Sequence, residues 1–235
     1  MSDYSTLLTQ NLAAVRDRVA NAAEQSNRKP EDVCLLGVTK YVDAEITRQF
    51  VMAGCQDLGE SRPQALWPKA ESLVDLDVRW HQIGHLQRNK LRKTQPLISL
   101  IHSVDSIRLL DAINQLQGEI SPDNPQEILL EVNTSGDDAK HGFSTEAIRE
   151  AVDTVSDRAN VRLRGLMCMA GLGTSVDEAR QDFAKLRALR DSLADEYPAL
   201  DLSELSMGMS SDFEAAIAEG ATIVRVGSVL FEGVR

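Results

Sequence analysis

Strand-like apolar runs and amphipathic helix-like runs alternate along most of this chain. The first strand-like run, Val33 to Thr39, is apolar at both alternating positions, as in a parallel strand covered on both faces. Seven more follow, each with a helix-like run after it, at 56–59, 79–83, 97–103, 127–132, 161–169, 202–207 and 222–226. Eight strand–helix units without a hairpin predict a (β/α)8 barrel of the α/β class. A doubly wound open sheet is the alternative, and it would require two of the short strands to be misassigned.

An additional helix is expected before the first strand. Its apolar residues recur at spacings of three and four, the pattern of one buried helical face, at Leu8, Leu12, Val15, Val19 and Ala22. We expect residues 1–235 to form one domain, with 1–30 packed on the barrel as the extra N-terminal helix. A short helix over 228–232 is expected to close the chain.

Capping residues predict where two of the later helices begin. Asp105 is expected to cap the helix that follows the fourth strand. Ser211 and Glu214 have the spacing of a capping box, in which each side chain accepts a hydrogen bond from the other residue's backbone.

Charge and cysteine content restrict the partners and the compartment. The formal net charge of -11 gives a surface that repels a phosphate backbone, so no nucleic-acid partner is expected. The three cysteines are widely spaced, which fits neither a disulfide framework nor a zinc site and suits a reducing compartment. No signal peptide and no run of roughly 18 apolar residues is found, so no membrane association is expected. We expect a soluble cytoplasmic protein that is a monomer, with a dimer as the alternative.

Lys40 ends the first strand-like run, at the end of the strand where barrels of this kind place their sites. It shares parity with Leu36 and Val38, so its side chain could point into the barrel mouth. Apolar, partly desolvated surroundings would disfavour the ammonium and free the amine to form a Schiff base. A solvated lysine at a strand end is the other interpretation, and Lys40 alone does not decide between them.

Two turns rich in glycine and serine follow the last two strands, SMGMSSD after the seventh and RVGS after the eighth. This fold often binds phosphate between these two loops. Gly208 and Gly227 would let backbone N–H groups approach closely, and Ser210 and Ser228 would add hydroxyl donors at helix starts. The serines could instead only cap helices, but two such loops in the expected places favour a phosphate site.

Arg225 alternates with Ile223 and Gly227, so it is predicted to face the barrel interior, where a guanidinium needs an acceptor. A pyridine nitrogen could be that acceptor, and an arginine there would keep the nitrogen unprotonated. A salt bridge to a carboxylate such as Glu131 is the alternative. A strand-end lysine, a phosphate cradle and this arginine together suggest pyridoxal phosphate.

No metal site is expected. His81 and His85 are four residues apart, but Gly84 lies between them at a strand end, so they are not expected to share a helical face. The segment NTSGDDAKHG could line the barrel mouth, and its pair Asp137 and Asp138 fits a solvated turn better than a metal site.

Several motifs in a fixed order, from about residue 33 to the end of the chain, resemble the pyridoxal phosphate homeostasis protein family. They are VTK, GES, WHQIGHLQRNK, VNTSGDDAKHGF, RGLMCMA, LSMGMSSDFEAAI and VRVGS. The fold of that family is similar to the N-terminal barrel of alanine racemase. The resemblance implies that Lys40 carries pyridoxal 5'-phosphate as an internal aldimine, that Ser210, Gly227 and Ser228 hold the phosphate, and that Arg225 faces the pyridine nitrogen.

Three further residues are candidate contacts of the cofactor: Ser61, His81 and Met207. Ser61 stands where the family usually has asparagine, which shortens a side chain expected near the cofactor. Ser228 stands where the family often has threonine, and this change keeps the hydroxyl.

By resemblance the protein would hold pyridoxal phosphate in intracellular homeostasis and deliver it to apoenzymes, without efficient turnover. Two-base racemisation needs a second base opposite the lysine, which alanine racemases take from a second domain. Here the sequence ends soon after the eighth strand, and Tyr41 has the parity opposite to that of Lys40. An amino-acid racemase, a Schiff-base aldolase acting on a sugar phosphate, and a partner-binding scaffold are the alternative functions.

Overall fold

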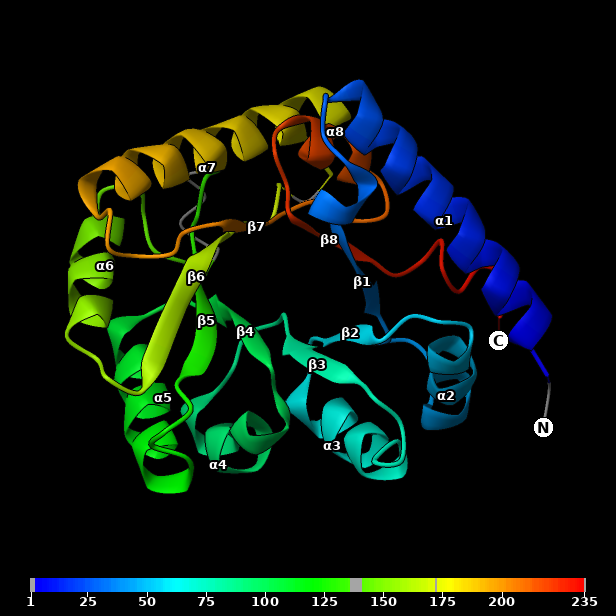
Figure 1. Ribbon diagram of the computed structural model, residues 1–235, viewed down its shortest axis with the longest axis horizontal. Helices are drawn as coiled ribbons and strands as arrows, with labels where there is room; N and C mark the ends of the chain where they lie inside the picture. The colour runs from blue at the N-terminus through cyan, green and yellow to red at the C-terminus, as the bar shows by residue number, and fades with distance from the viewer. Residues whose placement is uncertain (1–2, 136–140, 172, 235) are drawn as a thin grey trace.

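A closed barrel of parallel strands forms the centre of the molecule (Figure 1). The computed structural model describes residues 3–135, 141–171 and 173–234. Within them the strands pair in chain order, and the last pairs with the first. The strands are β1 (Cys34–Val38), β2 (Asp57–Glu60), β3 (Arg79–Gln82), β4 (Leu100–Val104), β5 (Gln126–Glu131), β6 (Val161–Met167), β7 (Glu204–Ser206) and β8 (Ile223–Val226). The predicted (β/α)8 barrel is confirmed, and the open-sheet alternative is wrong.

Helices surround the barrel on the outside (Figure 1). They are α1 (Ser5–Gln25), α2 (Ala44–Met52), α3 (Pro63–Ser72), α4 (Leu91–Thr94), α5 (Ile107–Ile120), α6 (Ile148–Ser156), α7 (Val176–Glu196) and α8 (Phe213–Ala218). Short 3-10 helices are η1 (Pro30–Asp32), η2 (Arg88–Lys90) and η3 (Gln95–Leu97). The apolar stripe of α1 is buried, and this helix packs against α2 and α8. None of the helices in the described part of the chain combines the length and the hydropathy that a membrane span requires.

Two helix starts differ from the prediction. Ser106, not Asp105, caps α5, and its Oγ accepts from the Leu109 N–H at 3.4 Å. The Asp105 side chain, at the end of β4, is therefore not used as the helix cap. The expected capping box at 211–214 is also absent, because α8 begins one residue later, with Asp212 at its N-cap, and Glu214 pairs with Arg18.

The expected helix at 228–232 is a succession of turns. The Leu230 N–H donates to the Gly227 carbonyl at 3.0 Å, and the Val234 N–H donates to the Phe231 carbonyl at 3.1 Å. These bonds span three residues, which closes turns but does not propagate an α-helix.

The hydrophobic core has two parts. The larger one fills the space between the barrel and its helices, and a smaller one lies inside the barrel. The interior cluster consists of Leu36, Val38, Ile83, Leu100, Leu129, Met167 and Ile223. Polar side chains share this interior, among them Arg225 and His102, which are 4% and 0% exposed. Buried polar groups require hydrogen-bond partners, so these residues define a network as well as a core.

Candidate functional site

Lys40 lies two residues beyond the end of β1, at the C-terminal mouth of the barrel, and its side chain is exposed. It belongs to a turn, where strand parity no longer determines the direction of a side chain. The Lys40 Nζ consequently lies 4.9 Å from the centre of the Tyr41 ring, although strict alternation would have separated the two. The Lys40 side chain is open to solvent, whereas the sequence had suggested apolar, partly desolvated surroundings.

The backbone just before Lys40 is fixed by buried polar groups. The Thr39 Oγ1 donates to Glu60 Oε1 at 2.9 Å, and the Thr39 N–H donates to the Gly59 carbonyl at 3.1 Å. Lys69, from α3, donates to the Thr39 carbonyl at 2.7 Å and forms an ion pair with Glu60. Lys69 and Glu60 are 5% and 0% exposed, so their mutual pairing satisfies two charges that burial would otherwise penalise. This network sets the point from which Lys40 leaves the barrel wall.

The turns after β7 and β8 lie against each other and against the end of β1. The Gly227 N–H donates to Ser210 Oγ at 3.1 Å, so this N–H is already used within the protein. A Cβ on Gly227 would lie 3.3 Å from the Val38 carbonyl oxygen, which shows how closely this turn approaches β1. Gly208 has φ of +88°, and a Cβ there would lie 2.5 Å from the Ala216 Cβ. Ser228 is exposed beside this cradle.

The three further candidates fall in different places. Ser61 follows β2 at the mouth, where its carbonyl accepts from Gln82 Nε2 at 3.2 Å. Met207 is fully buried in the outer core, because it follows the inward-facing Ser206 and so points away from the barrel. His81 faces the interior, but its ring reaches toward the N-terminal end of the barrel. Of these three, the structure brings only Ser61 to the mouth that Lys40 occupies.

Arg225 faces the barrel interior, as its parity predicted, and burial lowers its pKa. Its Nη1 donates to Ser206 Oγ at 2.7 Å and its Nη2 donates to the Cys168 carbonyl at 2.8 Å. Neither acceptor is charged. Among the described residues no carboxylate forms an ion pair with this guanidinium, so the predicted alternative of a Glu131 salt bridge is not observed.

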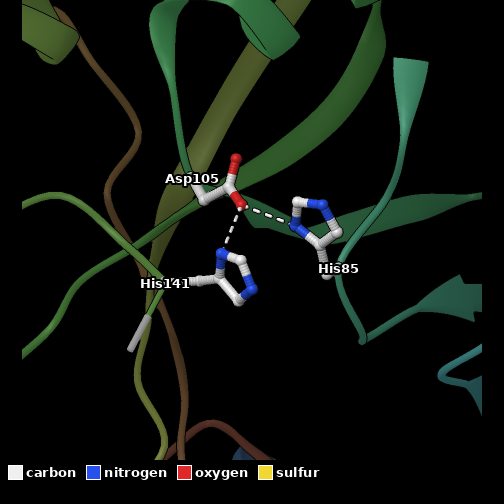
Figure 2. Close-up of side chains that lie close together, drawn as sticks. All are labelled: His85, Asp105 and His141. Atoms are coloured by element: carbon white, nitrogen blue, oxygen red, sulfur yellow. Dashed lines mark hydrogen bonds and ion pairs between the residues drawn. The ribbon is translucent and has the colours of Figure 1, made fainter. Parts of the chain in front are cut away.

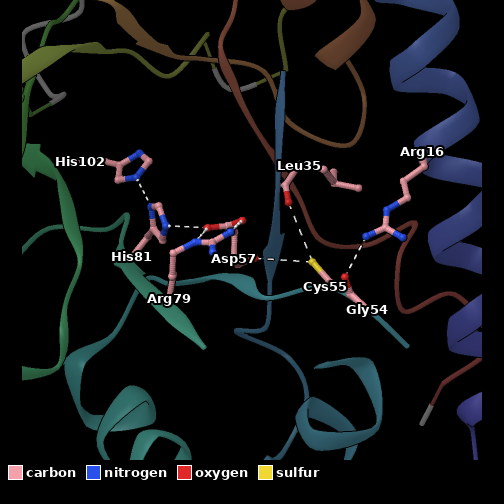
Figure 3. Close-up of polar contacts among 8 residues, drawn as sticks. All are labelled: Arg16, Leu35, Gly54, Cys55, Asp57, Arg79, His81 and His102. Carbon is pink, nitrogen blue, oxygen red and sulfur yellow. Dashed lines mark hydrogen bonds and ion pairs between the residues drawn. The ribbon is translucent and has the colours of Figure 1, made fainter. Parts of the chain in front are cut away.

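A chain of polar contacts continues from Arg225 across the barrel. Ser206 Oγ lies 2.8 Å from His102 Nδ1. Figure 3 shows the next contact, in which His102 Nε2 lies 2.9 Å from His81 Nδ1. Burial, with the nearby His81 and Arg225, holds the pKa of His102 well below its usual value, so this ring is neutral. A guanidinium only donates, so Ser206 accepts from Arg225 and its hydroxyl is free to donate to His102 Nδ1. His102 then carries its proton on Nε2 and donates to His81.

The chain ends at Asp57, at the start of β2 and therefore at the opposite end of the barrel from Lys40. His81 Nε2 lies 3.4 Å from Asp57 Oδ1, and Arg79 donates to both carboxylate oxygens at 2.7 and 2.5 Å (Figure 3). Burial raises the pKa of Asp57, but its contacts with His81 and Arg79 outweigh this effect and hold the pKa well below its usual range. The hydrogen bonds run in one direction from Arg225 to His81, and His81 Nε2 contacts Asp57 without hydrogen-bond geometry. This end lines a cavity of about 560 Å³.

A second polar group lies on the other side of the mouth. His85 Nδ1 is 2.8 Å and His141 Nδ1 is 3.6 Å from Asp105 Oδ2, and the two rings stack with centres 4.3 Å apart (Figure 2). Burial raises the pKa of the neighbouring Glu131 to about 7, with the charge of Asp105 adding to the effect. Sequence reasoning missed this group because Asp105 has the appearance of a helix cap. Asp137 and Asp138, predicted as a solvated turn, lie outside the described residues.

The protein combines a parallel barrel, a lysine after the first strand and small-residue turns after the last two strands. This combination defines a class of barrel protein, which comparison with known proteins identifies. The family model described as alanine racemase, N-terminal domain, matches residues 10–234. Relatives of this chain include the pyridoxal phosphate homeostasis protein of Aquifex aeolicus. The two are 40% identical over 223 residues, with 94% of this chain and 96% of the relative covered. That of Pseudomonas aeruginosa is 37% identical over 224 residues, with 95% and 94% covered. The chain belongs to the pyridoxal phosphate homeostasis protein family.

A solved structure supports the same grouping. PipY from Synechococcus elongatus, solved with PLP bound, is 36% identical and superposes with a TM-score of 0.85. The match covers 95% of this chain and 99% of PipY. The similarity therefore extends over nearly the whole of both chains.

Proposed function

We propose that this protein binds pyridoxal 5'-phosphate at the C-terminal mouth of the barrel, with Lys40 as its covalent anchor. The observation that carries the proposal is that Lys40 follows β1 and that Gly227, which contacts Ser210, follows β8, the strand paired with β1. Gly37 of β1 is in register with Val226 of β8, so the amine and the cradle emerge side by side. The PLP-bound structure of PipY, a relative of similar length, supports this assignment.

Each proposed contact has a chemical reason. The Lys40 amine can condense with the aldehyde of the cofactor and release one water. The hydroxyls of Ser210 and Ser228 can donate to the phosphate, and Gly227 lets the second turn approach the end of β1 closely, because a side chain there would meet Val38. Pyridoxal phosphate supplies an electron sink whose strength depends on protonation of its ring nitrogen. Arg225 can only donate, so it would hold that nitrogen unprotonated.

The proposed role is homeostasis of the cofactor. We infer that the protein holds pyridoxal phosphate in the cytoplasm as a monomer and releases it to apoenzymes, with no efficient turnover of its own. The names of its relatives support the role. The exposure of Lys40 supports release, because water and competing amines can reach the attachment point.

The proposal is tested by loading the protein with pyridoxal phosphate, recording its visible spectrum, reducing it with borohydride and mapping the modified peptide by mass. We expect one pyridoxyl group on Lys40 and loss of the visible band in Lys40→Ala. The control is Lys29→Ala, which removes an exposed lysine before β1, at the other end of the barrel, and should load like the wild type. A protein that stays colourless, or a label that persists in Lys40→Ala, would contradict the proposed anchor.

A second assay distinguishes a carrier from an enzyme. The loaded protein should restore activity to a cofactor-free transaminase, and it should not exchange the α-proton of amino acids in deuterated water. Sustained exchange that is lost in Lys40→Ala would favour the racemase alternative.

A further inference from the structure

Three successive strands each deliver one metal-binding side chain to the same point of the mouth. His85 follows β3, Asp105 follows β4 directly, and His141 lies in the segment after β5 (Figure 2). One ligand atom from each residue lies within 4.8 Å of the ligand atoms of the other two. Because β3, β4 and β5 are neighbours in a closed barrel, the wall itself brings the three groups together.

The backbone holds each of the two histidines in place. Before His85, the Gly84 carbonyl accepts from Gln82 Nε2 at 2.8 Å and from Ser103 Oγ at 2.7 Å. After His141, Gly142 has φ of +109°, a conformation that favours glycine. Phe143 then pairs with the end of β5, and its N–H donates to the Glu131 carbonyl at 2.8 Å. Both histidines therefore project from anchored backbone although their rings are exposed.

We propose that His85, Asp105 and His141 form a binding site for a divalent transition-metal ion of the zinc type. Two imidazoles and one carboxylate are a donor set that such ions prefer over Mg²⁺ or Ca²⁺. Tetrahedral zinc with bonds of about 2.0–2.1 Å keeps its ligand atoms about 3.3 Å apart. The observed separations from Asp105 Oδ2, 2.8 and 3.6 Å, lie on either side of that value.

The carboxylate of Asp105 is the charged group of the three residues. A cavity of about 430 Å³ borders His85 and Asp105 but not His141, and Arg88 and Arg108 also line it. The side chain of Asp105 is only 8% exposed, and its charge acts on the buried carboxyl of Glu131. A cation bound to Asp105 would offset this repulsion between two carboxyl groups in a region of low dielectric. The site does not use Lys40 or the phosphate cradle, so it is independent of the proposed cofactor.

The chain makes this proposal easy to test, because it has four histidines and the other two are buried inside the barrel. Cofactor-free protein is titrated with Zn²⁺ by isothermal calorimetry, and the visible spectrum of bound Co²⁺ reports the ligand geometry. We expect one saturable equivalent in the wild type. His141→Ala and Asp105→Asn should each weaken it at least tenfold, since even outer partners of metal ligands contribute 10–100-fold.

The control is Asp123→Asn, which removes the same charge from an exposed turn between α5 and β5 and should bind Zn²⁺ as the wild type does. His141 is 60% exposed, so its replacement should leave the fold intact, as circular dichroism can verify. The proposal is overturned if the wild type shows no saturable binding. It is equally overturned if binding persists undiminished in both His141→Ala and Asp105→Asn, because the metal would then lie elsewhere.

Discussion

The two histidine pairs of this protein show how burial changes what the same side chain can do. His81 and His102 lie inside the barrel, 6% and 0% exposed, in a chain whose ends are an obligate donor and an obligate acceptor. His85 and His141 stack at the mouth with side chains 44% and 60% exposed, and both approach one carboxylate. The interior pair is enclosed by fixed polar partners, whereas in the proposed metal site the mouth pair would exchange its present contacts for an ion.

Ser206→Ala would disrupt the contacts of the interior histidines and should have the largest effect on stability. It removes the oxygen that accepts from Arg225 and that contacts His102, leaving a buried charged donor and a buried ring nitrogen without that partner. Unsatisfied buried groups cost about 1–3 kcal/mol each, and more when charged. We expect the free energy of unfolding, measured in urea without cofactor, to fall by about 3 kcal/mol.

The matched control is Ser203→Ala, an exposed serine just before β7, which should change the free energy of unfolding by less than about 0.5 kcal/mol. Equal, small losses in the two variants would show that the interior chain adds nothing to stability.

Glu131→Gln tests the mouth, where a carboxyl is buried near another. Its pKa is raised from 4.5 to about 7, so the folded state holds this proton more tightly than the unfolded chain. The free energy of unfolding of the wild type should therefore decrease as pH rises from about 4.5 to 7 and stay low above that. Glutamine does not ionise, so the variant should be about 3 kcal/mol more stable than the wild type near pH 8 and about equal near pH 4.

Glu127→Gln is the control for this effect. Glu127 lies at the other end of β5 and its side chain is 41% exposed. Urea denaturation at both pH values should show no comparable difference between this variant and the wild type. The same pH dependence in Glu127→Gln would assign the effect to general charge and not to the mouth.

Nitrogen NMR of the histidine rings sharpens the comparison without altering the molecule. His102 should carry its proton on Nε2, because Ser206 accepts from Arg225 and can donate its own hydroxyl proton to His102 Nδ1. His102 should also stay neutral as pH falls through the range in which histidine usually protonates, since burial lowers its pKa. A proton on Nδ1 of neutral His102 would contradict the proposed direction.

The sequence predicted what depends on local pattern. Alternating apolar runs indicated the barrel, and the spacing of apolar residues in α1 indicated its buried face. Strand parity predicted that Arg225 faces inward. The partners of Arg225 could not be predicted in this way. Ser206 and His102 are 104 residues apart in sequence and meet only because the barrel closes. A useful signal was present in His81 and His102, since polar residues at inward positions of buried strands must find partners inside.

Asp105 and Met207 show a second limit. Asp105 and Ser106 are both good helix caps, and a shift of one residue decides which of them caps α5 and which faces the mouth. Met207 lies in a glycine-rich turn motif, but it follows the inward-facing Ser206 and so enters the outer core. Motif membership placed these residues near the site, and only the three-dimensional path of the chain determines where their side chains point.

The buried ion pair behind Thr39 has a consequence for regioselectivity. An aldehyde arriving at this end of the barrel has two lysines close to its path, Lys40 and Lys69. The Lys69 amine is enclosed, paired with Glu60 and bound to the Thr39 carbonyl, so it would have to lose an ion pair and a hydrogen bond before it could react. Lys40 has neither of these restraints among the described contacts, so of the two lysines the wall of the barrel leaves Lys40 accessible for the proposed attachment.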